Sequence, residues 1–180
     1  MDWSSKCKKI KAVVFDIDGT LTDGRIGYGC GSDDMIKFFS AKDGLAFRMC
    51  RQFGIKTAAL TARSDKANTK RLTSLHCDLI KDRCVTKGEG LQEIASFFDI
   101  QPENCMMIGD DFFDLPAFAI CGLSVAVADA APEVRDLADW VTVAKGGHGA
   151  MREAVERLLK SRDEWKDFIK PYYDLFKKNP

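Results

Sequence analysis

Five aspartates in two short stretches of the chain have the residue type and spacing needed for chemistry on a phosphate group. They follow two apolar runs, in "IKAVVFDIDGTLTDG" and "NCMMIGDDFFD", and are Asp16, Asp18, Asp110, Asp111 and Asp114. Buried carboxylates are costly unless a positive charge pairs with them. Carboxylates from two strand ends can share Mg²⁺, and one carboxylate can act as a nucleophile. The pattern therefore indicates either a neutralised ion-pair cluster or a site for phosphoryl transfer.

Hydroxyl and basic side chains follow other apolar runs. Thr61 ends the run 55–61, Arg63 comes two residues later, and Lys87 precedes a helix whose apolar face starts at Leu91. In an open α/β sheet, ligands bind at the carboxyl ends of the strands, so we expect these groups to meet the aspartates there. Each group alone has an ordinary explanation, such as a helix cap or a solvated lysine. Their joint arrival at strand ends favours a phosphoryl-transfer site.

Each residue type has a role in that chemistry. A cation and Lys87 would offset the repulsion between an anionic nucleophile and an anionic phosphate. A second carboxylate, two residues after the first, could protonate the leaving oxygen and then deprotonate the attacking water. Thr61 and nearby backbone N–H groups would bind the remaining phosphate oxygens.

Six short apolar runs would form the strands that position these groups. They cover residues 12–16, 55–61, 77–80, 104–110, 123–128 and 140–143. Their poor alternation is typical of strands covered on both faces. Helical patterns lie between them at residues 43–53, 91–98 and 115–119, and another helix is expected from 148 to 160. The alternation predicts an α/β fold, a doubly wound, Rossmann-like parallel sheet flanked by helices.

We expect residues 1–180 to form one domain. Two segments of it depart from the alternation of strands and helices. The glycine-rich residues 24–40 predict a β-hairpin inserted between the first strand and its helix. Residues 161–180 form an aromatic tail in which Pro171 should break or kink the helix. Packing of this tail on the body or on a partner subunit, and disorder of its last residues, both remain open.

Composition limits the classes of function. The chain is 46% hydrophobic and carries 27 basic and 27 acidic residues, so its balanced charge gives no support for a nucleic-acid or membrane-surface role. No window reaches the roughly 18 apolar residues of a membrane span. The seven cysteines include no C-x-x-C spacing and mostly lie in apolar surroundings. We therefore expect reduced, structural cysteines in a cytoplasmic protein.

The same residues resemble the four motifs of the haloacid dehalogenase superfamily of phosphatases: "DIDGTLTDG", a strand-terminal threonine, a lysine before a helix and "GDDFFD". Further stretches, "AKDG", "TARSDKANTKR", "GLSVAVADAAPEV" and "GGHGAMREAVERLL", resemble the 3-deoxy-D-manno-octulosonate 8-phosphate phosphatase family of lipopolysaccharide synthesis. The similarity runs from about residue 10 to residue 160. It implies a phosphatase of the branch without a large cap domain.

The resemblance also implies roles for individual residues. Asp16 would be the nucleophile and Asp18 the acid/base, with Thr61 and Lys87 binding the phosphate. Mg²⁺ would be held by the side chains of Asp16 and Asp110 and the backbone carbonyl of Asp18. Asp111 and Asp114 would hold the metal's waters and the lysine. The sugar acid would contact Ser40, Ala41, Lys42, Asp43, Gly44, Arg48, Arg63 and Arg71, although helix-surface ion pairs are an alternative for Arg48 and Arg71.

The family further implies a homotetramer in which hairpins pack together and neighbouring chains help close each active site. The chain departs from the family pattern at three positions. Ala62 stands where glycine is usual, Lys42 replaces an arginine, and Thr86 precedes Lys87 in place of Asp or Asn. A methyl group at position 62 would disfavour a positive φ close to the phosphate.

Three alternatives remain. A related phosphatase acts on a nine-carbon keto-deoxy sugar acid 9-phosphate, but that branch resembles Thr-Gly-Glu at the second motif, so Arg63 favours the eight-carbon substrate. A receiver domain also has an acidic cluster, but its phosphorylated aspartate follows the third strand. A catalytically dead assembly domain of this fold is disfavoured by the intact Asp16, Asp18, Lys87 and Asp110.

Overall fold

The computed structural model describes residues 3–29 and 35–178, and its centre is a six-stranded parallel sheet. The strands lie in the order β5 (Leu79–Lys81), β4 (Lys56–Leu60), β1 (Ala12–Phe15), β6 (Cys105–Gly109), β7 (Leu123–Ala126) and β8 (Trp140–Val141). Ala12 of β1 pairs with Lys56 on one side and with Cys105 on the other. Because the chain winds outward from β1 in both directions, the predicted doubly wound sheet is confirmed.

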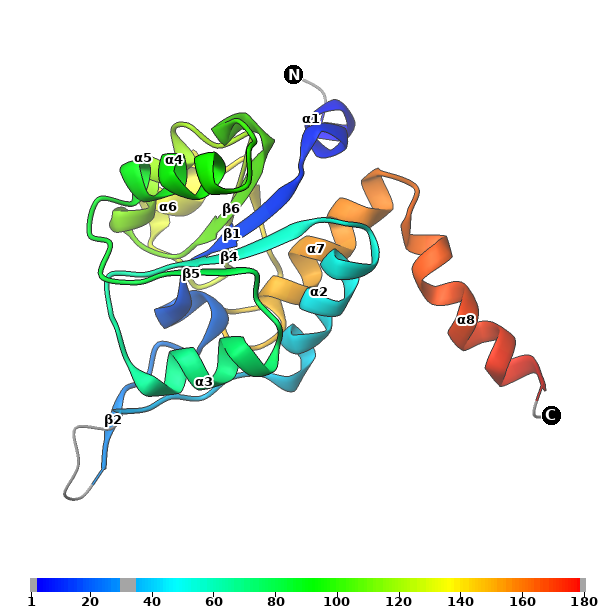
Figure 1. The fold of residues 1–180 in the computed structure, drawn as a ribbon, viewed down its shortest axis with the longest axis horizontal. Helices are drawn as coiled ribbons and strands as arrows, with labels where there is room; N and C mark the ends of the chain where they lie inside the picture. Colours follow the sequence, from blue (N-terminus) through cyan, green and yellow to red (C-terminus); the bar gives the residue numbers. More distant parts are fainter. Residues whose placement is uncertain (1–2, 30–34, 179–180) are drawn as a thin grey trace.

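Helices cover both faces of this sheet (Figure 1). Helices α2 (Ala41–Gln52) and α7 (Ala150–Ser161) pack together on one face, and α4 (Lys87–Phe97) and α5 (Leu115–Phe118) on the other. Residues of β1, β6 and β7 are buried along their full length, which is why these runs show no alternation. Further elements are α1 (Trp3–Lys9), α3 (Lys66–Ser74), α6 (Pro132–Leu137), and the turns η1 (Ile17–Leu21), η2 (Pro102–Asn104) and η3 (Phe112–Asp114).

The predicted hairpin follows β1 and η1. Strands β2 (Gly27–Tyr28) and β3 (Met35–Ile36) pair antiparallel, and Thr22 pairs with Phe39 at the base. Residues 30–34, at the tip, lie outside the described part. The described chain holds no large cap domain between β1 and α2, as expected.

The tail begins with the helix α8 (Trp165–Lys178), which extends away from the body in Figure 1. Of the two effects predicted for Pro171, the break is wrong, because the helix continues through this residue, and the kink stays a prediction. The carbonyl that loses its partner there belongs to the exposed Asp167, where water can replace the missing N–H. Phe168 is buried and stacks on Trp165, so the first turn packs on the body, whereas Tyr173 and Phe176 are exposed.

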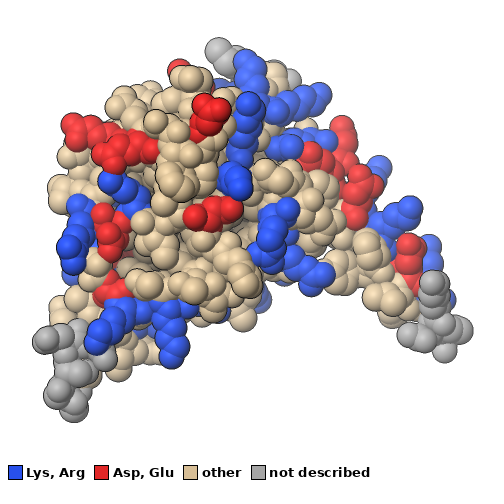
Figure 2. Space-filling model, viewed as in Figure 1, with Lys and Arg blue, Asp and Glu red and all other residues tan. Residues whose placement is uncertain are grey.

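Acidic and basic side chains are interspersed over the face seen in Figure 2. Among residues 3–29 and 35–178, no helix is long and apolar enough to cross a membrane. None of the six described cysteines forms a disulfide, and Cys7, Cys50 and Cys105 are buried as small core residues. Cys30 lies outside the described residues.

Candidate active site

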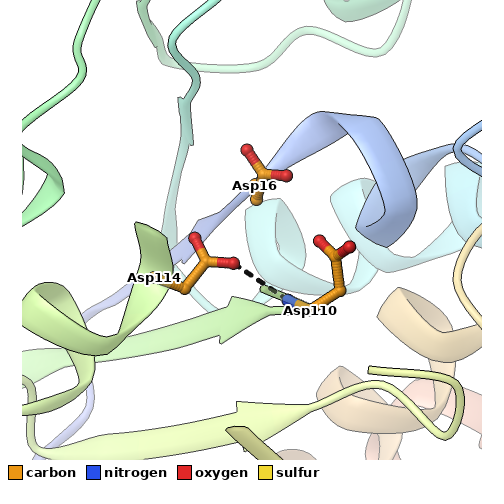
Figure 3. Close-up of side chains that lie close together, drawn as sticks. All are labelled: Asp16, Asp110 and Asp114. Atoms are coloured by element: carbon orange, nitrogen blue, oxygen red, sulfur yellow. Dashed lines mark hydrogen bonds between the residues drawn. The ribbon is translucent and has the colours of Figure 1, made fainter. Parts of the chain in front are cut away.

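The carboxyl ends of β1 and β6 bring three aspartates together. Asp16 follows β1 and Asp110 follows β6. Asp114 lies in the turn η3, four residues after Asp110. One carboxylate oxygen from each lies within 4.8 Å of the others, and the three side chains converge in Figure 3. The strands β1 and β6 are neighbours at the point where the chain reverses its winding direction, which is where open α/β sheets bind ligands.

Asp114 is already engaged by the protein. Its Oδ1 lies 2.5 Å from Nζ of Lys87, and its Oδ2 accepts hydrogen bonds from the backbone N–H groups of Asp110 and Asp111 at 2.9 and 3.2 Å. Asp114 therefore holds the lysine and the loop after β6. Asp16 and Asp110 are left as the pair best placed to hold a cation.

Lys87 is the positive charge of the site and is 4% exposed. Its Nζ lies 2.7 Å from Oδ1 of Asp16 as well as 2.5 Å from Asp114. Burial lowers the pKa of Lys87, but the two carboxylates outweigh it and raise the pKa above its ordinary value. Lys87 is thus a permanent cation in contact with Asp16.

The site still holds more negative than positive charge. Burial raises the pKa of Asp16 to about 6, although Lys87 opposes the rise. Burial, together with the carboxylates of Asp16 and Asp114, raises the pKa of Asp110 to about 8. One lysine does not neutralise three carboxylates, so a divalent cation between Asp16 and Asp110 would remove the remaining repulsion.

The turn after β1 is shaped around Asp110. Gly19 has φ +100°, and a Cβ at this position would lie only 2.1 Å from Oδ2 of Asp110. Thr20 Oγ1 donates a hydrogen bond to Oδ1 of Asp110 at 2.9 Å. Only glycine permits this backbone conformation and this close approach. The cradle, with its two hard carboxylate ligands, fits a Mg²⁺ ion.

A second glycine loop supports the same turn. The N–H of Gly147 donates to the carbonyl of Thr20 at 3.0 Å, and a Cβ on Gly146 would lie 1.7 Å from the carbonyl oxygen of Gly19. The two loops therefore pack backbone against backbone. The turn after β1 is fixed by residues more than a hundred positions further along the chain.

The raised pKa values predict how Mg²⁺ binding depends on pH. Between the ordinary aspartate pKa of 3.8 and the values of about 6 and 8, the folded protein binds more protons than the unfolded chain. These two groups therefore make the metal-free protein less stable as the pH rises through this window. We expect Mg²⁺ to raise the unfolding temperature more at about pH 8 than at about pH 6, because protons compete with the cation. Thermal unfolding with Mg²⁺ or with EDTA measures this, and an equal shift at both pH values would contradict it.

Asp18 lies beside this cluster but faces a different set of partners. Its Oδ1 is 2.6 Å from Nζ of Lys37, and its Oδ2 is 3.6 Å from Nε of Arg63. Lys37 was missed by the sequence analysis, because a lysine in a hairpin resembles a solvated surface residue. Its inward position at every second residue, with Met35 and Phe39, is the signal that could have identified it.

The second motif forms one wall of the site. Thr61 is 2% exposed, and its Oγ1 accepts a hydrogen bond from the N–H of Arg63 at 3.2 Å, which leaves the hydroxyl proton to be donated elsewhere. Ala62 has no positive φ, so its methyl group causes no backbone strain. A cavity of about 130 Å³ is lined by Asp16, Asp18, Thr61, Ala62, Arg63, Lys87, Asp110, Asp111, Phe113 and Asp114.

The residues predicted to contact the sugar acid are placed differently. Asp43 is 1% exposed, and its two oxygens accept hydrogen bonds from the N–H groups of Gly149 and Arg152 at the start of α7. Ser40 caps α2, and its carbonyl accepts a hydrogen bond from Arg71. Arg48 lies over the ring of Tyr172 in α8. Of the predicted sugar-acid residues outside the phosphate motifs, only Arg63 lines the cavity, and Ser40, Ala41, Lys42, Asp43, Gly44, Arg48 and Arg71 do not.

Comparisons with known proteins show which family this chain resembles. A family model described as haloacid dehalogenase-like hydrolase matches residues 64–153. The 3-deoxy-D-manno-octulosonate 8-phosphate phosphatase of Haemophilus influenzae is 36% identical over 157 residues, 87% of each chain. The corresponding protein of Escherichia coli strain K12 is also 36% identical, over 88% of this chain and 84% of its own.

Solved structures extend the similarity to three dimensions. The phosphatase of this name from Moraxella catarrhalis, in complex with magnesium, phosphate and a KDO molecule, superposes with a TM-score of 0.90 at 32% identity, over 94% of this chain and 97% of its own. The cobalt-bound enzyme of H. influenzae gives a TM-score of 0.86 at 35% identity, over 91% and 95%.

Proposed function

This chain belongs to the haloacid dehalogenase-like hydrolases and, within them, to the 3-deoxy-D-manno-octulosonate 8-phosphate phosphatase family, and from that premise we propose how it hydrolyses this sugar-acid phosphate. The enzyme is a Mg²⁺-dependent phosphoric monoester hydrolase of lipopolysaccharide synthesis. The observation that carries the mechanism is the contact of Asp16 with Lys87 beside Asp110, at the ends of β1 and β6.

Asp16 is the nucleophile in this proposal. Its carboxylate attacks phosphorus, the bond from phosphorus to the sugar oxygen breaks, and an aspartyl-phosphate forms. The side chains of Asp16 and Asp110 and the carbonyl of Asp18 would hold Mg²⁺, which would supply charge stabilisation of the transferring group. Lys87 neutralises the nucleophile and binds a phosphate oxygen, and Thr61 donates its hydroxyl proton to another.

Asp18 moves the proton in both halves of the reaction. It donates a proton to the leaving sugar oxygen in the first half and accepts one from the attacking water in the second, so the enzyme ends in its starting state. Asp114 positions Lys87, since it pairs with Nζ at 2.5 Å. Asp111 lines the cavity and is proposed to hold a water of the metal.

The sugar acid needs more room than one chain provides. The cavity of about 130 Å³ is smaller than the roughly 300 Å³ at which small-molecule pockets begin. We infer that a neighbouring subunit of a homotetramer completes the pocket. Seven residues of the hairpin, α2 and α3 do not line the cavity and belong to this part of the proposal, either in the same site or in that of a neighbouring subunit: Ser40, Ala41, Lys42, Asp43, Gly44, Arg48 and Arg71.

The setting proposed for this enzyme is the cytoplasm. Support comes from the buried cysteines Cys7, Cys50 and Cys105, because none of them forms a disulfide, as is typical of a reducing compartment. The interspersed charges support a small-molecule substrate rather than nucleic acid or a membrane surface as the partner.

Phosphate release from a panel of sugar-acid phosphates, with and without Mg²⁺, tests the function. We expect Mg²⁺-dependent release that is fastest on the eight-carbon octulosonate 8-phosphate. Faster release from a nine-carbon keto-deoxy sugar acid 9-phosphate would move the enzyme to that branch. Release of phosphate from none of these substrates would favour the alternative that the chain is a catalytically dead assembly domain of this fold.

Arg63 carries the prediction about substrate choice. Its side chain is 51% exposed at the cavity, where a guanidinium can bind the carboxylate of the sugar acid. We expect Arg63→Glu to lower kcat/KM on the octulosonate phosphate by about 100-fold, and far less on a small generic phosphate ester. Arg135→Glu, at an exposed arginine of α6, is the control. Equal losses on both substrates would show that Arg63 does not read the sugar acid.

A further inference from the structure

Lys37 is the most deeply buried lysine side chain near the cavity. The residue follows β3 at the base of the hairpin, and its side chain is 0% exposed. Burial of an ammonium group is costly unless acceptors surround it. The fold therefore has to supply partners for Lys37, and these partners show what the residue does.

The partners of Lys37 come from two different elements. Nζ lies 2.6 Å from Oδ1 of Asp18 and 2.6 Å from Oδ2 of Asp65, and it donates a hydrogen bond to Oδ1 of Asn68 at 3.2 Å. Asp65 caps α3, because its Oδ1 accepts a hydrogen bond from the N–H of Asn68 at 2.8 Å. Three acceptors thus surround the three donors of the ammonium group. Lys37 connects the hairpin, the start of α3 and the proposed acid/base.

Asp18 depends on this contact for its orientation. Apart from the ionic contacts with Lys37 and Arg63, neither of its carboxylate oxygens has a hydrogen-bond partner among the described residues. Its other ionic partner, Arg63, is half exposed and 1 Å more distant, at 3.6 Å against 2.6 Å. The contact with the buried Lys37 is shorter and better shielded from water than the contact with the exposed Arg63, so it holds the carboxylate more firmly.

We propose that Lys37 is a positioning residue that holds the carboxylate of Asp18 where it meets the leaving oxygen of the substrate. The inference rests on the proposed function, because it assigns Lys37 a part in the proton transfer of that reaction. The hairpin then does more than meet neighbouring chains. It supplies the group that orients the acid/base of its own subunit.

The nature of the leaving group separates positioning from a merely structural role. Breaking the bond to a sugar oxygen requires a proton from Asp18, whereas 4-nitrophenolate leaves without one. The ratio kcat/KM reports the steps up to formation of the aspartyl-phosphate, in which the leaving group departs. We expect Lys37→Met to lower kcat/KM on the octulosonate phosphate by about 100-fold, and on 4-nitrophenyl phosphate by less than about 5-fold. Because both values come from one preparation, their ratio is independent of the folded fraction.

A double variant tests whether Lys37 acts through Asp18. Asp18→Asn removes the proton donor, so adding Lys37→Met to it should lower kcat/KM on the octulosonate phosphate no further. Lys37→Arg keeps the charge and should recover part of the loss. Lys56→Met removes a lysine that pairs with an aspartate, Asp78, at the other end of the sheet, and should leave the ratio of the two substrates unchanged.

The outcomes are distinct. Equal losses of Lys37→Met on both substrates, no loss on either, or an additive loss in the double variant would each overturn the inference. If Lys37→Met does not fold, Asp65→Asn carries the same test, since it removes the second ion pair of the lysine at constant size, and it should shift the ratio in the same direction. Failure of the proposed function would appear in the wild-type protein as an absence of turnover. Failure of the inference would appear only in the ratios of the variants.

Discussion

Replacement of Asp16 by asparagine is expected to lower Mg²⁺-dependent phosphate release by about 10⁴-fold or more. The amide has the size of the carboxylate but is not a nucleophile, and it donates where Lys87 and the cation need an acceptor. After an acid quench of a reacting sample, the wild-type protein should carry one phosphate on residue 16, and the variant none. Phosphate release and the mass of the quenched protein measure the two expectations.

The control for this variant is Asp99→Asn. Asp99 is exposed, and its φ of +54° is one that asparagine tolerates, so the same chemical change is made away from the site. Its turnover should match the wild type, and Asp16→Asn should retain a folded structure by circular dichroism. Substantial turnover by folded Asp16→Asn would remove Asp16 from the role of nucleophile.

Replacement of Lys87 by methionine should affect both stability and rate. The change leaves the buried carboxylates of Asp16 and Asp114 without the cation that lies 2.7 and 2.5 Å from them. Loss of one partner of a buried ion pair costs about 3–5 kcal/mol of unfolding free energy. Loss of a charged donor to the transferring phosphate lowers kcat by about 10²–10³-fold. Denaturant unfolding and steady-state kinetics measure the two effects.

Mg²⁺ should recover part of the stability of Lys87→Met, because it neutralises Asp16 and Asp110, and should recover little of the rate. The matched control is Lys81→Met, since Lys81 pairs with Glu93 in an exposed salt bridge. Exposed pairs of this kind contribute little to stability, so the control should unfold close to the wild type. If the two variants had the same free energy of unfolding, the ionic contacts of Lys87 would not contribute to the stability of the fold.

The sequence was sufficient for the parts of the molecule that obey a simple rule. Compact apolar runs gave the strands, and the convergence of strand ends brought Asp16, Thr61, Lys87 and Asp110 to one cavity. The rule works because all strands of this sheet are parallel, so every carboxyl end lies on the same edge. The hairpin could also be predicted from the sequence, because a glycine-rich stretch between two short apolar runs is typical of a β-hairpin.

Contacts between side chains that are distant in the sequence could not be predicted from local sequence patterns. Nothing in the spacing of the sequence shows that Lys37 meets Asp65 or that Asp43 caps α7. These contacts depend on how the hairpin and helices dock, which local patterns do not encode. The predicted helix break at Pro171 was wrong for another reason. The rule that proline breaks helices does not take solvent into account, and water can donate a hydrogen bond to the exposed carbonyl of Asp167.

The packing of the Gly146–Gly147 loop on the turn after β1 has a consequence for how the enzyme is made. The carbonyl of Thr20 accepts a hydrogen bond from the N–H of Gly147. The turn that holds Asp110 in place therefore lacks this hydrogen bond until residue 147 has been synthesised. Contacts this far apart in sequence form late in folding. A nascent chain can therefore build β1, β4 and β6 while the site is still unformed. We expect catalytic competence to arise only after residue 147 has been synthesised, and a chain that stops before this residue to have none.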